Sequence, residues 1–129
     1  MKPTFKELKE LLKNSYAPYS KFETAAIVET DKGNFKGVNV ENASYPNGIC
    51  AERNAIFNAV THGAEKFKSL YLISSSKRND ITPCGMCRQV MVELFNTSAK
   101  IICFNVLGKS RTYTLNQLLP YFFKKEQLK

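Results

Sequence analysis

Three cysteines and a glutamate of this chain stand at spacings that suit a metal-dependent reaction. Cys50 and Glu52 are separated by one alanine, and Cys84 and Cys87 are three positions apart, directly after Pro83. Zinc binds thiolates readily, and a catalytic zinc keeps three protein ligands and leaves its fourth position for water. A carboxylate two residues from a ligand can lie beside that water without joining the coordination sphere. The spacing therefore predicts a catalytic zinc site with Cys50, Cys84 and Cys87 as ligands and Glu52 as the group that moves protons.

Other interpretations of the same residues are open at this point. A lone Cys-x-x-Cys pair also occurs in structural zinc sites and in redox pairs, and Cys103 could complete a closed site of four thiolates. Cys103 lies in the apolar run 101–104, however, where we expect a small buried residue. Glu52 by itself could be an ordinary acid in the first turn of a helix.

A site of this kind needs a positive partner. Three thiolates on one zinc leave a net negative charge, which weakens the ability of the metal to acidify water. We therefore expect Arg53, next to Glu52, to donate to a cysteine sulfur and compensate that charge. Arg88 is the second candidate for this role.

Both motifs are predicted to lie at the start of a helix. We expect helices from about residue 50 to residue 62, with Gly63 as the stop, and from about residue 84 to residue 95. The N-terminus of a helix offers partial positive charge and unpaired N–H groups, which favour thiolate over thiol. The buried stripe of the first of these helices is predicted to contain Ala55, Ile56, Ala59 and Val60.

The remaining pattern predicts one α/β domain over residues 1–129. Thr4 and Glu7 have the spacing of a capping box at the start of an N-terminal helix. Strands over 22–30 and 34–41 are joined by a hairpin turn, so the sheet must be mixed. Further strands are expected at 69–74, 100–106 and 113–115. Strands that alternate with helices indicate a sheet covered by helices.

Composition is that of an ordinary soluble globular domain. No stretch of the 129 residues approaches the roughly 18 apolar residues that span a bilayer. The first residues interleave charged and apolar side chains, so we expect no secretory signal and a cytoplasmic location, where thiols stay reduced. The net charge of +8 is scattered along the chain, which favours a solvated surface over a nucleic-acid interface.

The residues around the two motifs resemble the small cytidine deaminases of pyrimidine salvage. The similarity extends over nearly the whole chain and includes the segments 16–22 (YAPYSKF), 37–45 (GVNVENASY), 49–53 (ICAER), 83–90 (PCGMCRQV) and 118–120 (LLP). It implies a three-layer α/β/α sandwich with a mixed five-stranded sheet. It also implies a hydrolase that converts cytidine and deoxycytidine to uridine and deoxyuridine. One zinc per subunit, a homotetramer with shared sites, and no nucleic-acid or membrane partner are implied as well.

The resemblance also assigns roles to single residues. Zinc-bound hydroxide attacks the base while Glu52 shuttles the protons. Asn39 and Glu41 hold the ribose hydroxyls, because residues two apart on a strand share a face. Phe22 packs on the pyrimidine ring, and the backbone near Ala51 and Cys84 reads the base edge. Tyr45 and Phe123 reach the site of a neighbouring subunit.

Two departures from the family pattern concern the rim of the pocket and hence the base preference. The family usually has Pro-Val-Gly-Ala where residues 23–26 read Glu-Thr-Ala-Ala, and it often has Thr in place of Gly48. Two rival functions are a structural zinc module that binds RNA and a deaminase of a polynucleotide base or an antifungal nucleoside. The pair Asn39 and Glu41 and the compact chain favour the enzyme acting on free nucleosides.

Overall fold

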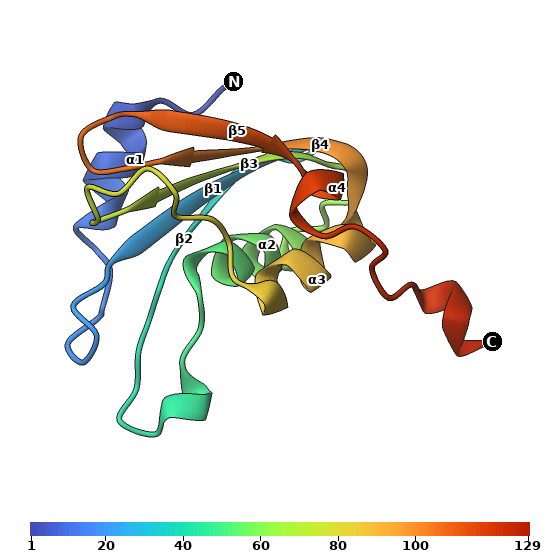
Figure 1. The fold of residues 1–129 in the computed structure, drawn as a ribbon, viewed down its shortest axis with the longest axis horizontal. Helices are drawn as coiled ribbons and strands as arrows, with labels where there is room; N and C mark the ends of the chain where they lie inside the picture. Colours follow the sequence, from blue (N-terminus) through green and yellow to red (C-terminus); the bar gives the residue numbers. More distant parts are fainter.

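The computed structural model describes residues 1–129 and contains one mixed five-stranded sheet (Figure 1). The strands are β1 (Thr24–Thr30), β2 (Gly33–Val38), β3 (Phe67–Ser74), β4 (Phe95–Phe104) and β5 (Ser110–Thr114), and they lie in the order β2-β1-β3-β4-β5. The pair β3 and β4 is parallel, and the other neighbouring pairs are antiparallel. The mixed sheet that the sequence predicts is confirmed.

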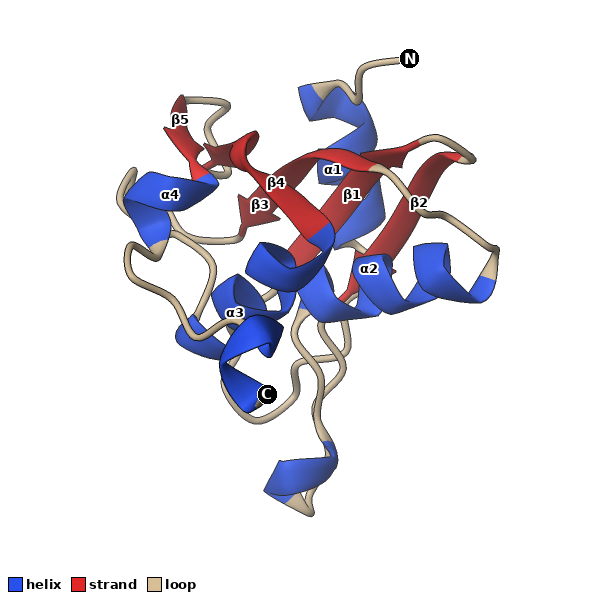
Figure 2. Cartoon of the chain, turned by 90° about the vertical axis from the view of Figure 1, so that its right-hand side faces the viewer, coloured by secondary structure: helices blue, strands red, loops and turns tan.

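Helices cover both faces of the sheet and make three layers (Figure 2). Helix α1 (Phe5–Leu12) lies on one face, and α2 (Ala51–Thr61), α3 (Gly85–Leu94) and the short α4 (Leu115–Leu118) lie on the other. The larger hydrophobic cluster is between the sheet and the second group of helices, and the smaller one is beneath α1. The predicted capping box of α1 is present, since Glu7 N donates to Thr4 Oγ1 at 3.1 Å.

Several predicted element boundaries differ from the structure, among them that of β5, which covers Ser110–Thr114 instead of residues 113–115. Strand β2 ends at Val38 instead of continuing to residue 41, because the chain turns away from β1 and Val40 pairs only in isolated bridges. Strand β4 starts at Phe95, directly after α3, well before residue 100. Val60 is 49 % exposed, because the face of α2 that meets the sheet is centred on Ala55, Ile56 and Ala59 and leaves Val60 outside it.

Helix α2 lies unusually close to the edge strand β2. A Cβ added at Gly37 would come within 2.3 Å of Ala55 N and 2.8 Å of Ala51 O, so only glycine allows this approach. Asn54 Nδ2 then donates to Val38 O at 3.0 Å, and Asn58 Nδ2 donates to Lys36 O at 3.3 Å. These contacts fix the N-terminus of α2, and hence residues 50–53, to the sheet.

Two segments project from the body of the molecule (Figure 1). One is the loop around the 3-10 turn Tyr45–Asn47, and the other is the C-terminal segment that ends in the 3-10 turn Lys125–Leu128. Both carry exposed aromatic side chains. No helix of the chain has the length and apolar character that crossing a membrane requires.

Candidate metal centre and substrate cavity

The structure brings together the three cysteines that the sequence predicts as metal ligands. Cys50 and Cys84 are the N-cap residues of α2 and α3, and Cys87 lies in the first turn of α3. Their sulfur atoms all lie within 4.8 Å of one another, with 3.7 Å between Cys50 and Cys84 and 3.5 Å between Cys84 and Cys87. Thiolates bound at about 2.3 Å to one tetrahedral zinc stand about 3.8 Å apart. The donor set therefore fits a zinc ion.

The fourth cysteine is not part of this cluster. Cys103 lies on β4, is buried in the larger hydrophobic cluster, and is absent from the group of sulfurs that could share an ion. Burial raises the pKa of Cys103 to about 12. The prediction of a small buried residue at this position is confirmed.

Cys50 and Cys87 differ in their tendency to ionise. Hydrogen bonding from Cys87, followed by that from Arg53 and Cys84, lowers the pKa of Cys50 to about 5. The hydrogen bond with Cys50, followed by the burial of Cys87, raises the pKa of Cys87. Two helix N-termini also point at the cluster, and their partial positive charge favours thiolate.

Arg53 is placed to compensate that charge. Its Nη2 donates to Cys50 Sγ at 3.4 Å, and the interactions with Cys50 and Cys87 raise the pKa of the guanidinium. Its Nε is buried without a hydrogen-bond partner, so the group has donor capacity left for a fully ionised set of thiolates. Arg88, the second candidate, donates instead to Thr82, Pro83 and Leu118 and to no sulfur.

Glu52 is a buried carboxyl group beside the cysteines. It is only 5 % exposed, yet it belongs to the lining of a cavity that most of the predicted site residues share. Burial, followed by the charge of Cys50, raises the pKa of Glu52 to about 7. A carboxyl group with such a pKa can both accept and return a proton near neutral pH.

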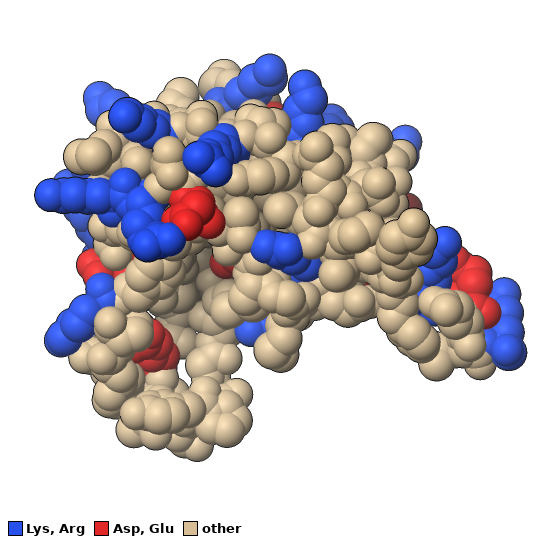
Figure 3. Space-filling view, in the orientation of Figure 1, with Lys and Arg blue, Asp and Glu red and all other residues tan.

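That cavity has a volume of about 540 Å³, within the range of small-molecule sites. It opens as a hollow between the projecting loop 42–48 and the body of the molecule (Figure 3). Eight of the residues predicted for the site line it: Phe22, Asn39, Glu41, Tyr45, Cys50, Glu52, Arg53 and Cys84. Ala51 is fully buried in the hydrophobic cluster and is not part of the lining, and Phe123 lies on the C-terminal segment.

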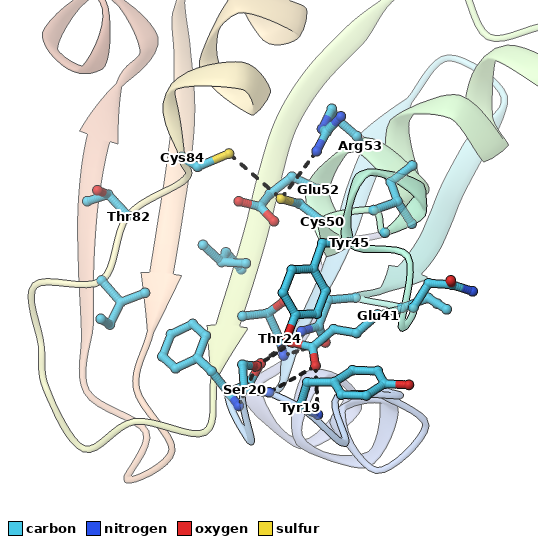
Figure 4. A pocket seen from close by; sticks show the side chains of 18 residues that line it. Tyr19, Ser20, Thr24, Glu41, Tyr45, Cys50, Glu52, Arg53, Thr82 and Cys84 are labelled. Carbon is cyan, nitrogen blue, oxygen red and sulfur yellow. Dashed lines mark hydrogen bonds between the residues drawn. The ribbon is translucent and has the colours of Figure 1, made fainter.

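Glu41 organises one end of the cavity (Figure 4). Its Oε1 accepts from the backbone N–H groups of Tyr19 and Ser20 at 3.1 and 3.0 Å, and its Oε2 accepts from the Ser20 hydroxyl. These bonds from Ser20 and Tyr19 lower the pKa of Glu41. The carboxylate is therefore ionised and has lone pairs left for further donors.

Asn39 has a different environment from its predicted partner. Its Oδ1 accepts from Thr24 N at 2.9 Å and from the Ser15 hydroxyl, and its Nδ2 donates to Phe22 O at 2.8 Å. Asn39 thus fixes the segment that carries Phe22, and one amide hydrogen remains free of these bonds. Asn39 and Glu41 lie beyond the end of β2, so the expectation that both stand on a strand is wrong.

Sequence reasoning missed several residues that shape this end of the cavity. Ser20 and Thr24 line it, and Ser15 supports Asn39 from outside the lining. Ser20 stands within the segment 16–22 that carries the resemblance, but nothing local indicates that its hydroxyl meets Glu41, 21 positions away.

Two aromatic side chains predicted to reach a neighbouring subunit are strongly exposed. Tyr45 is 76 % exposed, lines the cavity of its own chain, and packs edge-on against Tyr19 with ring centroids 6.2 Å apart. Phe123 is 54 % exposed, and its backbone carbonyl accepts from Gln89 Nε2 of α3 at 3.0 Å.

The family and the proteins to which this chain is similar agree with the metal centre described above. The family described as the cytidine and deoxycytidylate deaminase zinc-binding region matches residues 2–104. The chain is 35 % identical to a cytidine deaminase of Mycoplasma genitalium, over 93 % of this chain and 92 % of that protein. It is 38 % identical to one of Sporosarcina psychrophila, over 95 % and 90 %. The crystal structure of a cytidine deaminase from Burkholderia pseudomallei superposes with a TM-score of 0.82 at 38 % identity and covers 94 % of this chain and 100 % of that one.

Proposed function

The chain belongs to the zinc-dependent cytidine and deoxycytidylate deaminases, and from this premise we propose that it hydrolyses cytidine and deoxycytidine to uridine and deoxyuridine in pyrimidine salvage. The observation that carries the proposal is the cluster of three cysteine sulfurs beside a cavity that Cys50, Cys84 and the buried Glu52 line. Cys50, Cys84 and Cys87 would hold the zinc, which when bound supplies a Lewis acid that makes water a strong nucleophile at neutral pH.

Glu52 carries the proton transfers in this proposal. It accepts a proton from the water that attacks the amino-bearing carbon of the cytosine ring, and it delivers that proton to the adjacent ring nitrogen. The tetrahedral carbon then expels the amino group, which leaves as ammonia after Glu52 assists a second proton transfer. Cytidine and water thus give uridine and ammonia. The pKa of about 7 that burial gives this carboxyl group supports both directions of transfer.

Arg53 supports the site by compensating the charge of the thiolates. An Arg53→Ala variant is expected to lose zinc, activity or both. A variant that keeps full zinc content and full activity would contradict this role.

The sugar and the base are bound by the other residues of the cavity. The Glu41 carboxylate accepts from a ribose hydroxyl with its remaining lone pairs, and Asn39 donates its remaining amide hydrogen. Phe22, which is exposed at the cavity, packs on the pyrimidine ring, and backbone groups near Ala51 and Cys84 read the base edge. Arg53 is the only basic side chain of the lining and is engaged with sulfur, which supports an unphosphorylated nucleoside as the substrate.

We also infer a homotetramer in which subunits share their sites. The exposed Tyr45 and Phe123 on projecting segments support this arrangement, since large exposed aromatic side chains are typical of interfaces. Four unpaired cysteines suit a reducing compartment and support a cytoplasmic location.

The direct test follows ultraviolet absorbance of purified, zinc-quantified protein with cytidine and with deoxycytidine. We expect conversion of both nucleosides by protein that carries about one zinc per chain, and no conversion by Glu52→Ala. The ratio of the two rates then gives the sugar preference. Absence of turnover despite stoichiometric zinc would contradict the nucleoside assignment.

A further inference from the structure

Arg88 makes three hydrogen bonds that join separate parts of the chain. Its Nε donates to Pro83 O at 2.7 Å, its Nη2 to Thr82 Oγ1 at 2.6 Å, and its Nη1 to Leu118 O at 2.6 Å. The guanidinium group is a rigid planar fork, so three acceptors in different directions fix its position and are fixed by it. Neither of the ion pairs in the molecule involves Arg88.

Two of these acceptors directly precede a predicted metal ligand. Thr82 and Pro83 lead into Cys84, and Thr82 also lines the cavity. The Pro83 ring is buried, but Cys84 and Met86 are exposed, and a Cβ at Gly85 would meet no atom within 4 Å. Packing thus supports this turn at Pro83 and again at the buried Cys87, but not at the residues between them. The side-chain hydrogen bonds of Arg88 restrain the approach to Cys84, together with the bond from the Arg88 backbone N–H to Cys84 O at 3.0 Å.

The third acceptor lies at the C-terminal end of α4. The last carbonyl groups of a helix have no partner within it, and Arg88 satisfies that of Leu118. The next residue of α3, Gln89, holds Phe123 O. Figure 1 shows α4 and the start of the C-terminal segment beside α3. Two successive side chains of α3 therefore anchor the segment that carries Phe123.

We propose that Arg88 is a positioning residue that links the ligand loop Thr82–Cys84 to the C-terminal segment beyond Leu118, so that the geometry of the metal centre and the position of Phe123 are set together. The inference rests on the proposed role of Cys84 as a zinc ligand. Arg88 touches neither the sulfurs nor the cavity in this role and acts through Thr82, Pro83 and Leu118.

The primary test measures zinc release from folded protein to a chromophoric chelator. Partners that orient metal ligands typically contribute about 10- to 100-fold in metal affinity, and we expect faster zinc release in that range from Arg88→Ala. Thr82→Val removes one acceptor with little change of shape and is expected to have a smaller effect. In the Arg88→Ala background, Thr82→Val should add nothing. Arg78→Ala, which removes an exposed arginine paired with Asp80, is the control and should release zinc at the wild-type rate.

Two further readouts separate positioning from general stability. The absorption spectrum of the cobalt-substituted protein should change in Arg88→Ala, since it reports ligand geometry. Amide exchange in the zinc-free protein should rise together at Thr82 and Cys84 and at residues 119 and 121–123, since Pro83 and Pro120 have no amide hydrogen. An Arg88→Ala variant that is merely less stable, with an unchanged cobalt spectrum and wild-type zinc release, would overturn the inference.

The zinc content of the wild-type protein distinguishes failure of the proposed metal site from failure of the role proposed for Arg88. Wild-type protein that binds no zinc would overturn the proposed metal role of Cys84 and, with it, this inference. Wild-type protein that binds zinc, with variants that release it at the same rate, would overturn this inference alone. If Arg88→Ala does not fold, Arg88→Lys and Thr82→Val carry the test, because lysine cannot reach three acceptors at once and faster release is expected from both.

Discussion

Cys50 and Cys84 both cap the N-terminus of a helix, but the two helices are held in place by different means. Helix α2 is pressed against β2 at Gly37, and Ala51, Ala55 and Ala59 are fully buried along that contact. The start of α3 is exposed at Cys84 and Met86, and polar bonds from Arg88 restrain it. The start of α2 is thus packed into the core, whereas α3 starts at the surface with Cys84 and enters the core at the buried Cys87.

The different burial of the starts of α2 and α3 matches the chemistry of the residues that each start carries. Burial at the start of α2 raises the pKa of Glu52 to about 7, which an exposed carboxyl group would not have. Exposure at the start of α3 leaves Cys84 at the wall of the cavity, open to solvent. Substitutions in the contact between α2 and β2 should therefore act on folding, and those at the start of α3 on the site. Cys50, Glu52 and Arg53 lie at the start of α2 and still act on the site itself.

The largest effect is expected from Glu52→Gln. General acid–base groups contribute about 10²- to 10⁴-fold, and we expect a loss of activity near the upper end because one carboxyl group performs every transfer. The measurement is kcat with cytidine beside zinc content. Glu93→Gln on the exposed side of α3 is the control and should keep wild-type activity. Loss of zinc together with activity would mean that Glu52 supports the site instead of the reaction.

The second-largest effect is expected from a substitution that disrupts the contact between α2 and β2. Gly37→Ala places a Cβ within 2.3 Å of backbone atoms of α2, which a side-chain adjustment cannot relieve. We expect the free energy of unfolding to fall by about 3 kcal/mol or more, because overpacking against backbone displaces the whole helix. Urea unfolding of the zinc-free protein gives the value. A change below about 1 kcal/mol would contradict the view that α2 is fixed by this contact.

A glycine-to-alanine substitution at the start of α3 should have only a small effect on stability. A Cβ at Gly85 meets nothing within 4 Å, and Gly85 is the first residue of α3. Since alanine favours helix over glycine, we expect Gly85→Ala to raise the unfolding free energy by about 0.5 kcal/mol. The experiment is the same urea titration, with Gly37→Ala run beside it. A loss comparable to that of Gly37→Ala would show that the start of α3 is packed as tightly as α2.

Local sequence patterns predicted most of the fold. The capping box at Thr4, the hairpin turn at 31–33 and the stop at Gly63 depend on neighbouring residues, and all three are present. The exposure of Val60 and the early end of β2 depend on how α2 and the cavity segments pack across the sheet. Periodicity within one helix or strand contains no information about that arrangement.

The candidate site likewise contains residues that local motifs predict and residues that they do not predict. Each cysteine motif indicates a helix start, and two helix starts that share one metal suffice to predict the cluster. The bonds of Asn39 to Ser15 and of Arg88 to Leu118 join residues 24 and 30 positions apart. No spacing rule predicts such pairs, because they exist only once the strands and helices have assembled. The sequence therefore predicted the reactive groups and the adjacent Arg53, but not the distant residues that hold them in place.

The smallest effect concerns the far end of α2, where the chain enters β3. The Asp31 carboxylate, in the turn between β1 and β2, accepts from the backbone N–H groups of Glu65 and Lys66 at 3.0 Å each. These bonds, that of Lys66 first, lower the pKa of Asp31 below its usual 3.8. A carboxyl group with a lowered pKa stabilises the fold above its unfolded-state pKa, and this contribution disappears as the pH falls through the folded-state pKa. Asp31→Asn keeps an acceptor but cannot ionise.

Urea unfolding of wild type and Asp31→Asn between pH 2.5 and 7 measures this contribution, because their difference cancels every other titrating group. We expect a small difference that is constant above about pH 5 and shrinks toward the acid end of the range. That result would mean that α2 is anchored at both ends, by Gly37 near its start and by Asp31 beyond its end. A difference that does not change with pH would mean that the charge of Asp31 contributes nothing, and that the contacts of α2 with β2 alone hold this helix in place.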